Sequence, residues 1–226
     1  GNGLGLFCLM ADAWGFDKTL EHPSHLSAWA KMKLGWLAAR RPTIGLNPIG
    51  VAEELSADTQ LYKIGDGDYN FPKNEYLLIE YRAQKGEDTN LPGEGLLIYH
   101  VDESPAVPGN INEGHPWQDN DWPLNGKHYR VALVQADRLF SLERGINNGG
   151  ERDFFSTDYI DTLSPSADLN EPWNSPFPNT DSYQNGTVYQ TGIEIYGISS
   201  AGGLTMAFMF LGNPNPTYSV VSEEID

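Results

Sequence analysis

The sequence predicts a mainly β protein, an antiparallel β-sandwich of the jelly-roll type, with a short helical segment at its N-terminal end. Three observations predict this class. The 226 residues include 24 Gly and 15 Pro, so turns are frequent. Runs of strand length, rich in β-branched and aromatic residues, recur between these turns. The helical spacing of apolar residues lies near the N-terminus, before the β pattern begins.

The N-terminal segment contains the predicted helix. Pro23 and Ser24 open it, because proline suits a first helical turn, and it extends through Trp36. Gly35, near the end of the stretch, suits a C-terminal stop. The side chains spaced at three and four positions along this helix are Leu26, Trp29, Ala30, Lys33 and Leu34.

From about residue 46 onward the chain is predicted to be β. The strand candidates are Glu75–Arg82, Gly95–Val101, Tyr129–Ala136, Thr187–Ile198 and Leu204–Leu211. One more strand would involve Leu55, Leu61, Tyr62 and Ile64. The Ser-Ser-Ala-Gly-Gly run at 199–203 predicts a hairpin turn between the last two strands, and the spacing of the strands favours a sandwich.

The chain is predicted to have three parts. Residues 1–45 form the N-terminal segment, 46–212 form the β-sandwich domain, and 213–226, with two Asn-Pro steps and then acidic residues, form a linker or tail. Two long segments, 104–127 and 153–185, interrupt the strands and are rich in Pro, Asn and Asp. Loops of this length usually carry function or bind an ion.

The balance of charged residues limits the partners of the chain. The sum of 14 Lys and Arg against 31 Asp and Glu is 14 − 31 = −17. This argues against nucleic acid and anionic membranes, because binding phosphate needs a basic surface. The longest apolar run, Leu204–Leu211, is far shorter than the roughly 20 residues of a membrane span. Residue 1 is Gly and no signal peptide opens the chain, so we expect a piece of a longer protein.

Motifs of several enzyme classes are absent from the sequence. It contains no H-E-x-x-H zinc helix, no G-x-S-x-G nucleophile turn, no Walker-type phosphate loop and no EF-hand. Cys8 is the single cysteine, so the chain can form no intrachain disulfide and no thiolate zinc cluster. His22 and His25 are close in sequence, but Pro23 between them disfavours a helix through His22.

Acidic residues beside Gly-rich backbone suggest calcium. Hard oxygen ligands are what Ca²⁺ prefers. The candidate ligands are Asp102 and Glu103, at the end of one strand, and Asp137 and Asp153, on either side of an Asn- and Gly-rich turn. A solvated acidic face is the alternative interpretation, since 31 acidic residues produce clusters by chance. His100 with Asp102 equally suits a pair that supports a site, a hydrogen bond between domains or a polar cluster at a strand end.

Several segments resemble one family. Gly3–Ala11 and His25–Trp36 resemble the Met-turn and the following helix of the immune inhibitor A-like secreted zinc metallopeptidases, approximately G-x-G-x-[WF]-x-x-M and P-x-x-[LM]-[SN]-A-W-x-K-x-x-L-G-W. Further similar runs, in the same order, are Asn74–Arg82, Leu91–Glu103, Tyr129–Asp137 and Gly192–Phe210. Together these runs cover roughly residues 3–212.

The resemblance implies a metzincin-like peptidase. Met10 would be the Met-turn residue beneath the zinc, without being a ligand, and residues 1–45 would end the catalytic domain. The zinc-binding helix would lie immediately upstream of Gly1, so this chain alone would hold no catalytic zinc and would be inactive. The family is secreted and carries structural calcium, although the acidic segment at 149–153 departs from the family pattern.

Two functions follow as hypotheses. The first is the C-terminal portion of a secreted zinc endopeptidase, with protein or peptide substrates and the upstream catalytic segment as partners. The alternative is a non-enzymatic extracellular β-sandwich that binds carbohydrate or protein or builds an assembly, through Trp117, Trp122 and Trp173. Asn185, in Asn-Gly-Thr, is an N-glycosylation candidate that would suit secretion.

Overall fold

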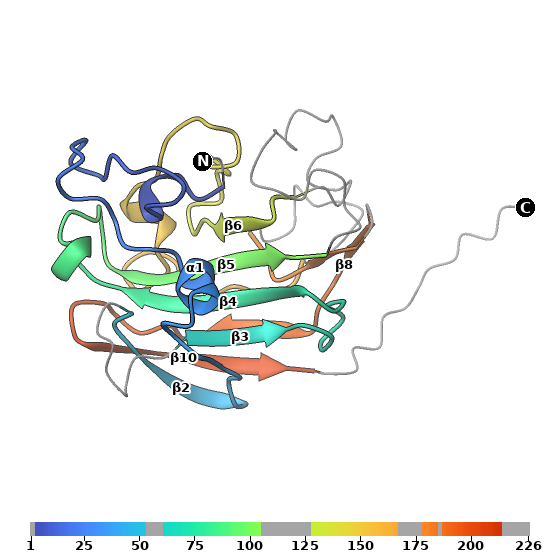
Figure 1. The fold of residues 1–226 in the computed structure, drawn as a ribbon. Coiled ribbons are helices and arrows are strands. Elements are labelled where there is room, and N and C mark those ends of the chain that lie inside the picture. The colour runs from blue at the N-terminus through green and yellow to red at the C-terminus, as the bar shows by residue number, and fades with distance from the viewer. Residues whose placement is uncertain (1–2, 53–60, 105–127, 167–177, 185–186, 214–226) are drawn as a thin grey trace, which may run out of the picture.

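The computed structural model describes residues 3–52, 61–104, 128–166, 178–184 and 187–213. Within this part the protein is mainly β, with one short α-helix, as the sequence predicts (Figure 1). No described helix is both long enough and apolar enough to cross a bilayer.

The larger sheet has five strands in the order β1-β3-β4-β5-β6. Its strands are β1 (Ala39–Arg40), β3 (Leu61–Gly65), β4 (Glu75–Arg82), β5 (Gly95–Asp102) and β6 (Val131–Val134). Neighbours pair antiparallel, except that β1 pairs parallel with β3. The pair β4–β5 is in register along its whole length, so these two strands form the centre of the sheet.

The smaller sheets complete the β structure. A three-stranded antiparallel sheet has the order β2-β10-β9, from β2 (Gly45–Gly50), β10 (Thr205–Gly212) and β9 (Ile193–Tyr196). A separate hairpin pairs β7 (Ser182–Gln184) with β8 (Thr187–Tyr189). The turn predicted at 199–203 joins β9 to β10.

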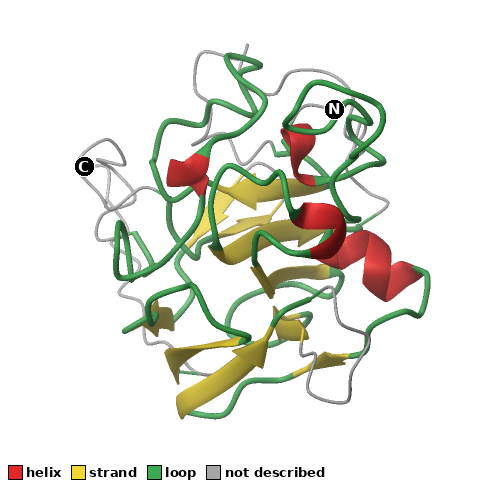
Figure 2. Cartoon of the chain, turned by 90° about the vertical axis from the view of Figure 1, so that its left-hand side faces the viewer, coloured by secondary structure: helices red, strands yellow, loops and turns green. Residues whose placement is uncertain are grey.

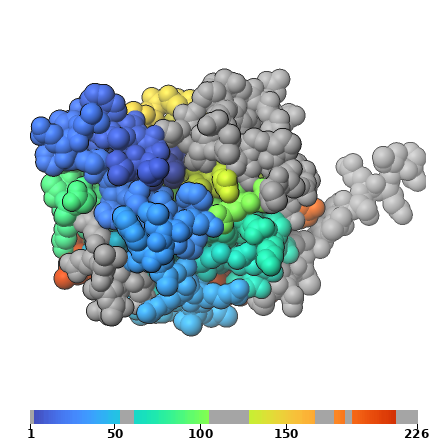
Figure 3. All heavy atoms as spheres, viewed as in Figure 1, coloured from blue at the N-terminus to red at the C-terminus, as the bar shows by residue number. Residues whose placement is uncertain are grey.

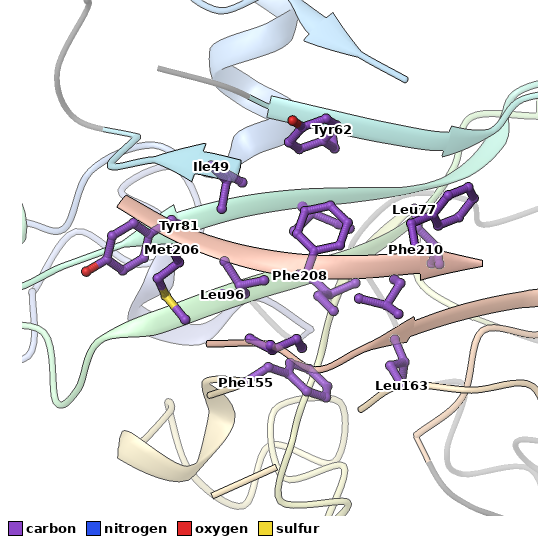
Figure 4. Packing of buried hydrophobic residues seen from close by; sticks show 14 of the residues in the cluster. Ile49, Tyr62, Leu77, Tyr81, Leu96, Phe155, Leu163, Met206, Phe208 and Phe210 are labelled. Carbon is purple, nitrogen blue, oxygen red and sulfur yellow. The ribbon is translucent and has the colours of Figure 1, made fainter. Parts of the chain in front are cut away.

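The five- and three-stranded sheets pack face to face around one apolar core (Figure 4). Tyr62 meets Phe208 of the opposite sheet edge-on, with ring centroids 5.2 Å apart. One isolated β-bridge, Val51 with Tyr81, joins the end of β2 to β4. The segment after β6 pairs with both sheets, since Phe155 bridges to Leu96 of β5 and Leu163 bridges to Ile195 of β9. The predicted sandwich is therefore present.

A third layer covers the other face of the five-stranded sheet. The helix α1 (Ala28–Lys33) and the turn before it lie across this face (Figures 1 and 2). Every residue of β4 and β5 is buried as a result. The alternation along β4 thus separates two buried faces, with Leu77 toward the sandwich core and Leu78 toward the N-terminal layer.

The helix α1 is shorter than the stretch from Ser24 to Trp36 that the sequence predicts. The helix begins after its N-cap Ser27, whose hydroxyl oxygen accepts a hydrogen bond from the Ala30 amide. It ends before Gly35, which has a φ of +73°. The Gly35 amide donates to the Met32 carbonyl and the Trp36 amide donates to the Lys31 carbonyl, which is a Schellman motif.

Two predicted strands also differ in extent. Thr187–Ile198 divides into β8 and β9, because Thr191 between them turns inward and donates its hydroxyl to the Thr180 carbonyl at 2.9 Å. Tyr129–Ala136 shortens to β6. The remaining helical turns are the 3₁₀ helices η1 (Gly5–Phe7), η2 (Gly86–Asp88) and η4 (Glu151–Asp153), and Leu55 lies outside the described residues.

Candidate functional site: an apolar groove beside Met10

The turn that carries Met10 is docked against β6 and the loop that follows it. The Gly3 amide donates to the Leu142 carbonyl at 3.2 Å, and the Leu133 amide donates to the Gly3 carbonyl at 2.7 Å. Gly5, at φ +51°, lies so close to this loop that a Cβ would be 2.4 Å from the Asn148 carbonyl oxygen. Only glycine fits this approach, which explains one glycine of the Gly-x-Gly run.

The next residues tie the same turn to the helix segment. The buried Cys8 sulfur accepts the Ser27 amide at 3.3 Å, and the Cys8 carbonyl accepts the Ala11 amide at 2.8 Å. The guanidinium of Arg82, on β4, donates to the Phe7 carbonyl at 2.9 Å. These contacts fix the backbone on both sides of Met10.

Buried ion pairs underlie this layer. Lys31 of α1 lies 2.9 Å from Glu80, and Arg82 pairs with Asp88, all four with almost no exposed surface. Burial lowers the pKa of Lys31. Burial opposes ionisation of Glu80 as well, but the charges of Lys31 and Arg82 outweigh it and lower the Glu80 pKa. The helix is therefore held to the sheet by charge as well as by apolar contact.

A groove opens between the Met10 turn, α1 and the start of β6. Its volume is about 510 Å³, and its walls are largely apolar. Met10 is 78% exposed and lines it, together with Leu34, which is 58% exposed. Figure 3 shows the N-terminal segment and α1, in blue, at the molecular surface. A hollow of this size suits an apolar ligand or segment.

Polar groups border the groove at one side. Arg130 and Lys33 both line it. Lys33 is paired with Glu103 at 2.7 Å, and the Glu103 carboxylate also accepts the indole N–H of Trp29 at 3.0 Å and the hydroxyl of Tyr76 at 2.9 Å. Burial works against ionisation of Glu103, but Lys33 and these donors hold its pKa below the usual value.

The predicted calcium residues form two separate pairs. Asp102 and Glu103 lie at the C-terminal end of β5. Asp102 accepts the Ser104 amide at 2.7 Å and lies 2.8 Å from the His128 ring nitrogen. Both oxygens of each carboxylate lie within hydrogen-bond distance of protein groups, so a cation here would compete with existing contacts. No interaction between these two residues and the other pair is present.

Asp137 and Asp153 lie near the opposite end of β5. Asp137 accepts the Leu139 amide at 2.9 Å, and Asp153 accepts the Gly150 amide at 2.8 Å through one oxygen. The other oxygen of Asp153 is buried and has no hydrogen-bond partner. Burial raises the pKa of Asp153 to about 7, with a further contribution from the charge of Asp137.

Glu143, which no sequence pattern indicates, lies near Asp153. It is 6% exposed, and Gln135 donates to its carboxyl group. Burial raises the Glu143 pKa to about 8, and the charges of Asp153 and Asp137 act in the same direction. No pattern of spacing indicates this residue, because its environment is assembled by the loop after β6.

A second polar cluster lies at the C-terminal end of β5. His100 is 2.9 Å from the buried carboxylate of Glu75, which also accepts the Tyr183 amide at 2.6 Å and the Ser182 hydroxyl at 3.1 Å. The His100 ring packs edge-on against His128, with centroids 5.2 Å apart. Of the interpretations offered for His100, these contacts match a polar cluster at a strand end. Glu75 also anchors the β7–β8 hairpin to this cluster.

Among the described residues, no group of three or more His, Cys, Asp or Glu side chains is arranged to hold a metal ion. Asn185, Trp117, Trp122 and Trp173 lie outside the described residues.

Comparison with known proteins adds no relative. No protein-family model matches the chain, and a search of curated proteins likewise found no match.

Proposed function

We propose that this chain is the C-terminal portion of a secreted zinc-dependent endopeptidase similar to the immune inhibitor A-like enzymes. Its H-E-x-x-H helix would lie upstream of Gly1, and the zinc bound there would activate water for attack on the peptide carbonyl. One observation carries the proposal. The residue that matches the Met-turn methionine, Met10, is exposed beside an apolar groove.

The exposure of Met10 supports this proposal. A methionine sealed in a core would leave no room for a metal-binding segment above it, whereas Met10 is 78% exposed. The turn is also rigidly supported, because Gly3, Phe7 and Cys8 are hydrogen-bonded to the β domain or to the helix segment. A fixed backbone suits the floor of a catalytic site, where small displacements are costly.

Structural calcium and secretion belong to the same proposal. Asp153 supports a calcium site best among the four candidates, because one of its buried oxygens has no donor. Asp137 is the nearest further candidate, since its charge acts on Asp153. Asp102 and Glu103 support calcium less, since protein groups already donate to both.

The test begins with the coding sequence upstream of Gly1. We expect an H-E-x-x-H motif within about 60 residues before it, the length of one or two βα-type units. The polypeptide expressed from its natural start should bind one zinc and cleave an unfolded protein, with activity lost to chelator and restored by zinc. An upstream region without the motif, together with a metal-free inactive protein, would refute the proposal.

The Met10 turn provides a sharper arm of the same test. Substitution of Met10 by Ala should lower kcat/KM by about tenfold, the scale of residues that support a metal site without binding the metal. Met209, on β10, does not line the groove and provides the matched control. Equal activities for M10A and M209A would show that Met10 does not support the catalytic site.

A further inference from the structure

The groove contains a cation that no described acid neutralises. Arg130 lines the groove and forms no ion pair with a described residue, although the chain has a net charge of −17. Its Nε is buried without a hydrogen-bond partner. Its guanidinium carbon lies 6.0 Å from the ring centroid of Trp29. A buried donor left unsatisfied carries a desolvation cost, which an incoming acceptor would relieve.

The surroundings of Arg130 determine what kind of acceptor fits. Leu4, Leu26 and Val131 line the same groove and are buried apolar residues. Lys33 does not compete for the ligand's charge, because it is already paired with Glu103. The groove thus offers one guanidinium beside an apolar wall. A ligand that satisfies both must carry a negative charge and an apolar group close together.

We propose that the groove binds the C-terminal residue of a peptide that ends in an apolar amino acid. The α-carboxylate would pair with Arg130, and the side chain would lie against the apolar wall beside Trp29. A carboxylate matches the planar donor fork of a guanidinium. The α-carboxylate and an apolar side chain share one carbon atom, so a single residue satisfies both parts of the groove.

The identity of this peptide as a cleavage product rests on the proposed function. Hydrolysis of a peptide bond adds water across it and leaves a new α-carboxylate on one fragment and an amine on the other. The groove would retain the fragment that carries the carboxylate. Binding of the carboxylate itself requires no zinc and no upstream segment.

The test compares an acid with its amide on the unmodified chain in the presence of chelator. The probes are N-acetyl-leucine, N-acetyl-leucine amide, N-acetyl-glycine and octanoate. Binding is followed by NMR through the Met10 methyl and Trp29 indole signals. N-acetyl-leucine should bind at least tenfold more tightly than the amide, because a charge-assisted pair is lost. It should also bind at least fivefold more tightly than N-acetyl-glycine, which lacks the apolar side chain.

Substitution of Arg130 tests the anchor. Arg130→Gln should weaken binding of N-acetyl-leucine about tenfold and leave that of the amide unchanged. Arg40→Gln is the matched control, because Arg40 is exposed on β1 and does not line the groove. If Arg130→Gln does not fold, the comparison of N-acetyl-leucine with its amide on the unmodified chain still tests whether the groove binds a carboxylate.

Each outcome supports or overturns the inference. Equal affinities for acid and amide, or no shift at Met10 and Trp29, would overturn it. Tighter binding of octanoate than of N-acetyl-leucine would assign the groove to alkyl carboxylates and overturn the peptide ligand. An upstream region without a zinc motif, combined with a clear preference for the acid, would refute the proposed endopeptidase while the binding site stands.

Discussion

Burial sets the protonation of two carboxyl groups beside the N-terminal turn. Glu143 and Asp153 are almost inaccessible, and burial raises their pKa values to about 8 and about 7. The loop that carries Glu143 also holds the turn, because the Leu142 carbonyl accepts the Gly3 amide. Glu143 is therefore adjacent in sequence to a residue that holds the N-terminal turn in place.

The stability of the protein should fall as pH rises from about 4.5 to about 8. In this window the folded state keeps the Glu143 proton and the unfolded state releases it, so rising pH favours unfolding. Glu143→Gln removes this linkage and should stabilise the protein at pH 8 by on the order of 3 kcal/mol. Urea unfolding at pH 5 and pH 8, in chelator, measures the difference.

Glu151→Gln is the control for this pH dependence, because Glu151 is an exposed acid in the same region. It should leave the slope of the unfolding free energy against pH close to that of the unmodified chain. A stability that rises between pH 5 and pH 8 and is unaffected by Glu143→Gln would show that the folded state does not retain this proton.

At the scale of elements, α1 depends on its ends and on its docking. A helix of six residues is too short to be stable alone. Ser27 satisfies an N-terminal amide, and Gly35 takes the left-handed conformation that closes the Schellman motif. Packing against β4 and the Lys31–Glu80 pair supply the remaining stability.

Gly35→Ala should lower the unfolding free energy by about 1 kcal/mol, because a Cβ is unfavourable at φ +73°. The cost is conformational, since a Cβ at Gly35 would meet no atom within 4 Å. Gly203→Ala, where the backbone is not left-handed and the nearest atom is 3.7 Å away, should change stability little. Chemical denaturation compares the two, and equal losses would show that the backbone conformation of Gly35 is not the cause.

At the scale of the whole molecule, three layers share one central sheet. The five-stranded sheet has an apolar core on one side and, on the other, a layer that combines apolar contacts with buried charges. The charges connect β4, η2, α1 and the Met10 turn, because Asp88 accepts the His25 amide and Arg82 donates to Phe7. Breaking this network should therefore loosen the N-terminal layer as a whole.

Asp88→Asn should destabilise the protein by about 3–5 kcal/mol, because it leaves the buried Arg82 without its closest counter-charge. The matched control is Asp68→Asn, which breaks the exposed pair with Arg41 and should cost about 1 kcal/mol or less. The free energy of unfolding and protease resistance of residues 3–45 provide the readouts. Similar losses for both variants would contradict a stabilising role of the buried network.

Much of the fold was predictable because strand signals are local. Glu75–Arg82 was placed with its correct ends, and the β-rich class follows from turn residues and β-branched runs. The ends of α1 could not be predicted from the sequence. Ser27 rather than Ser24 is the N-cap, and that choice depends on how residues 24–27 dock against the sheet. Of the residues at the candidate site, only Met10 could be predicted, through the family resemblance. Arg130 and Glu143 belong to no sequence motif that would have indicated them.

The amino-acid sequence alone determined that this chain is β-rich, strongly acidic and unable to form an intrachain disulfide, since composition and short-range periodicity record those properties. Tertiary structure decided which charges are buried, that both faces of β4 are covered, and that Met10 and Arg130 border one groove. The physical reason is distance along the chain. Met10 and Arg130 are separated by about half the protein, and only the packing of the N-terminal turn on β6 brings them to the same surface.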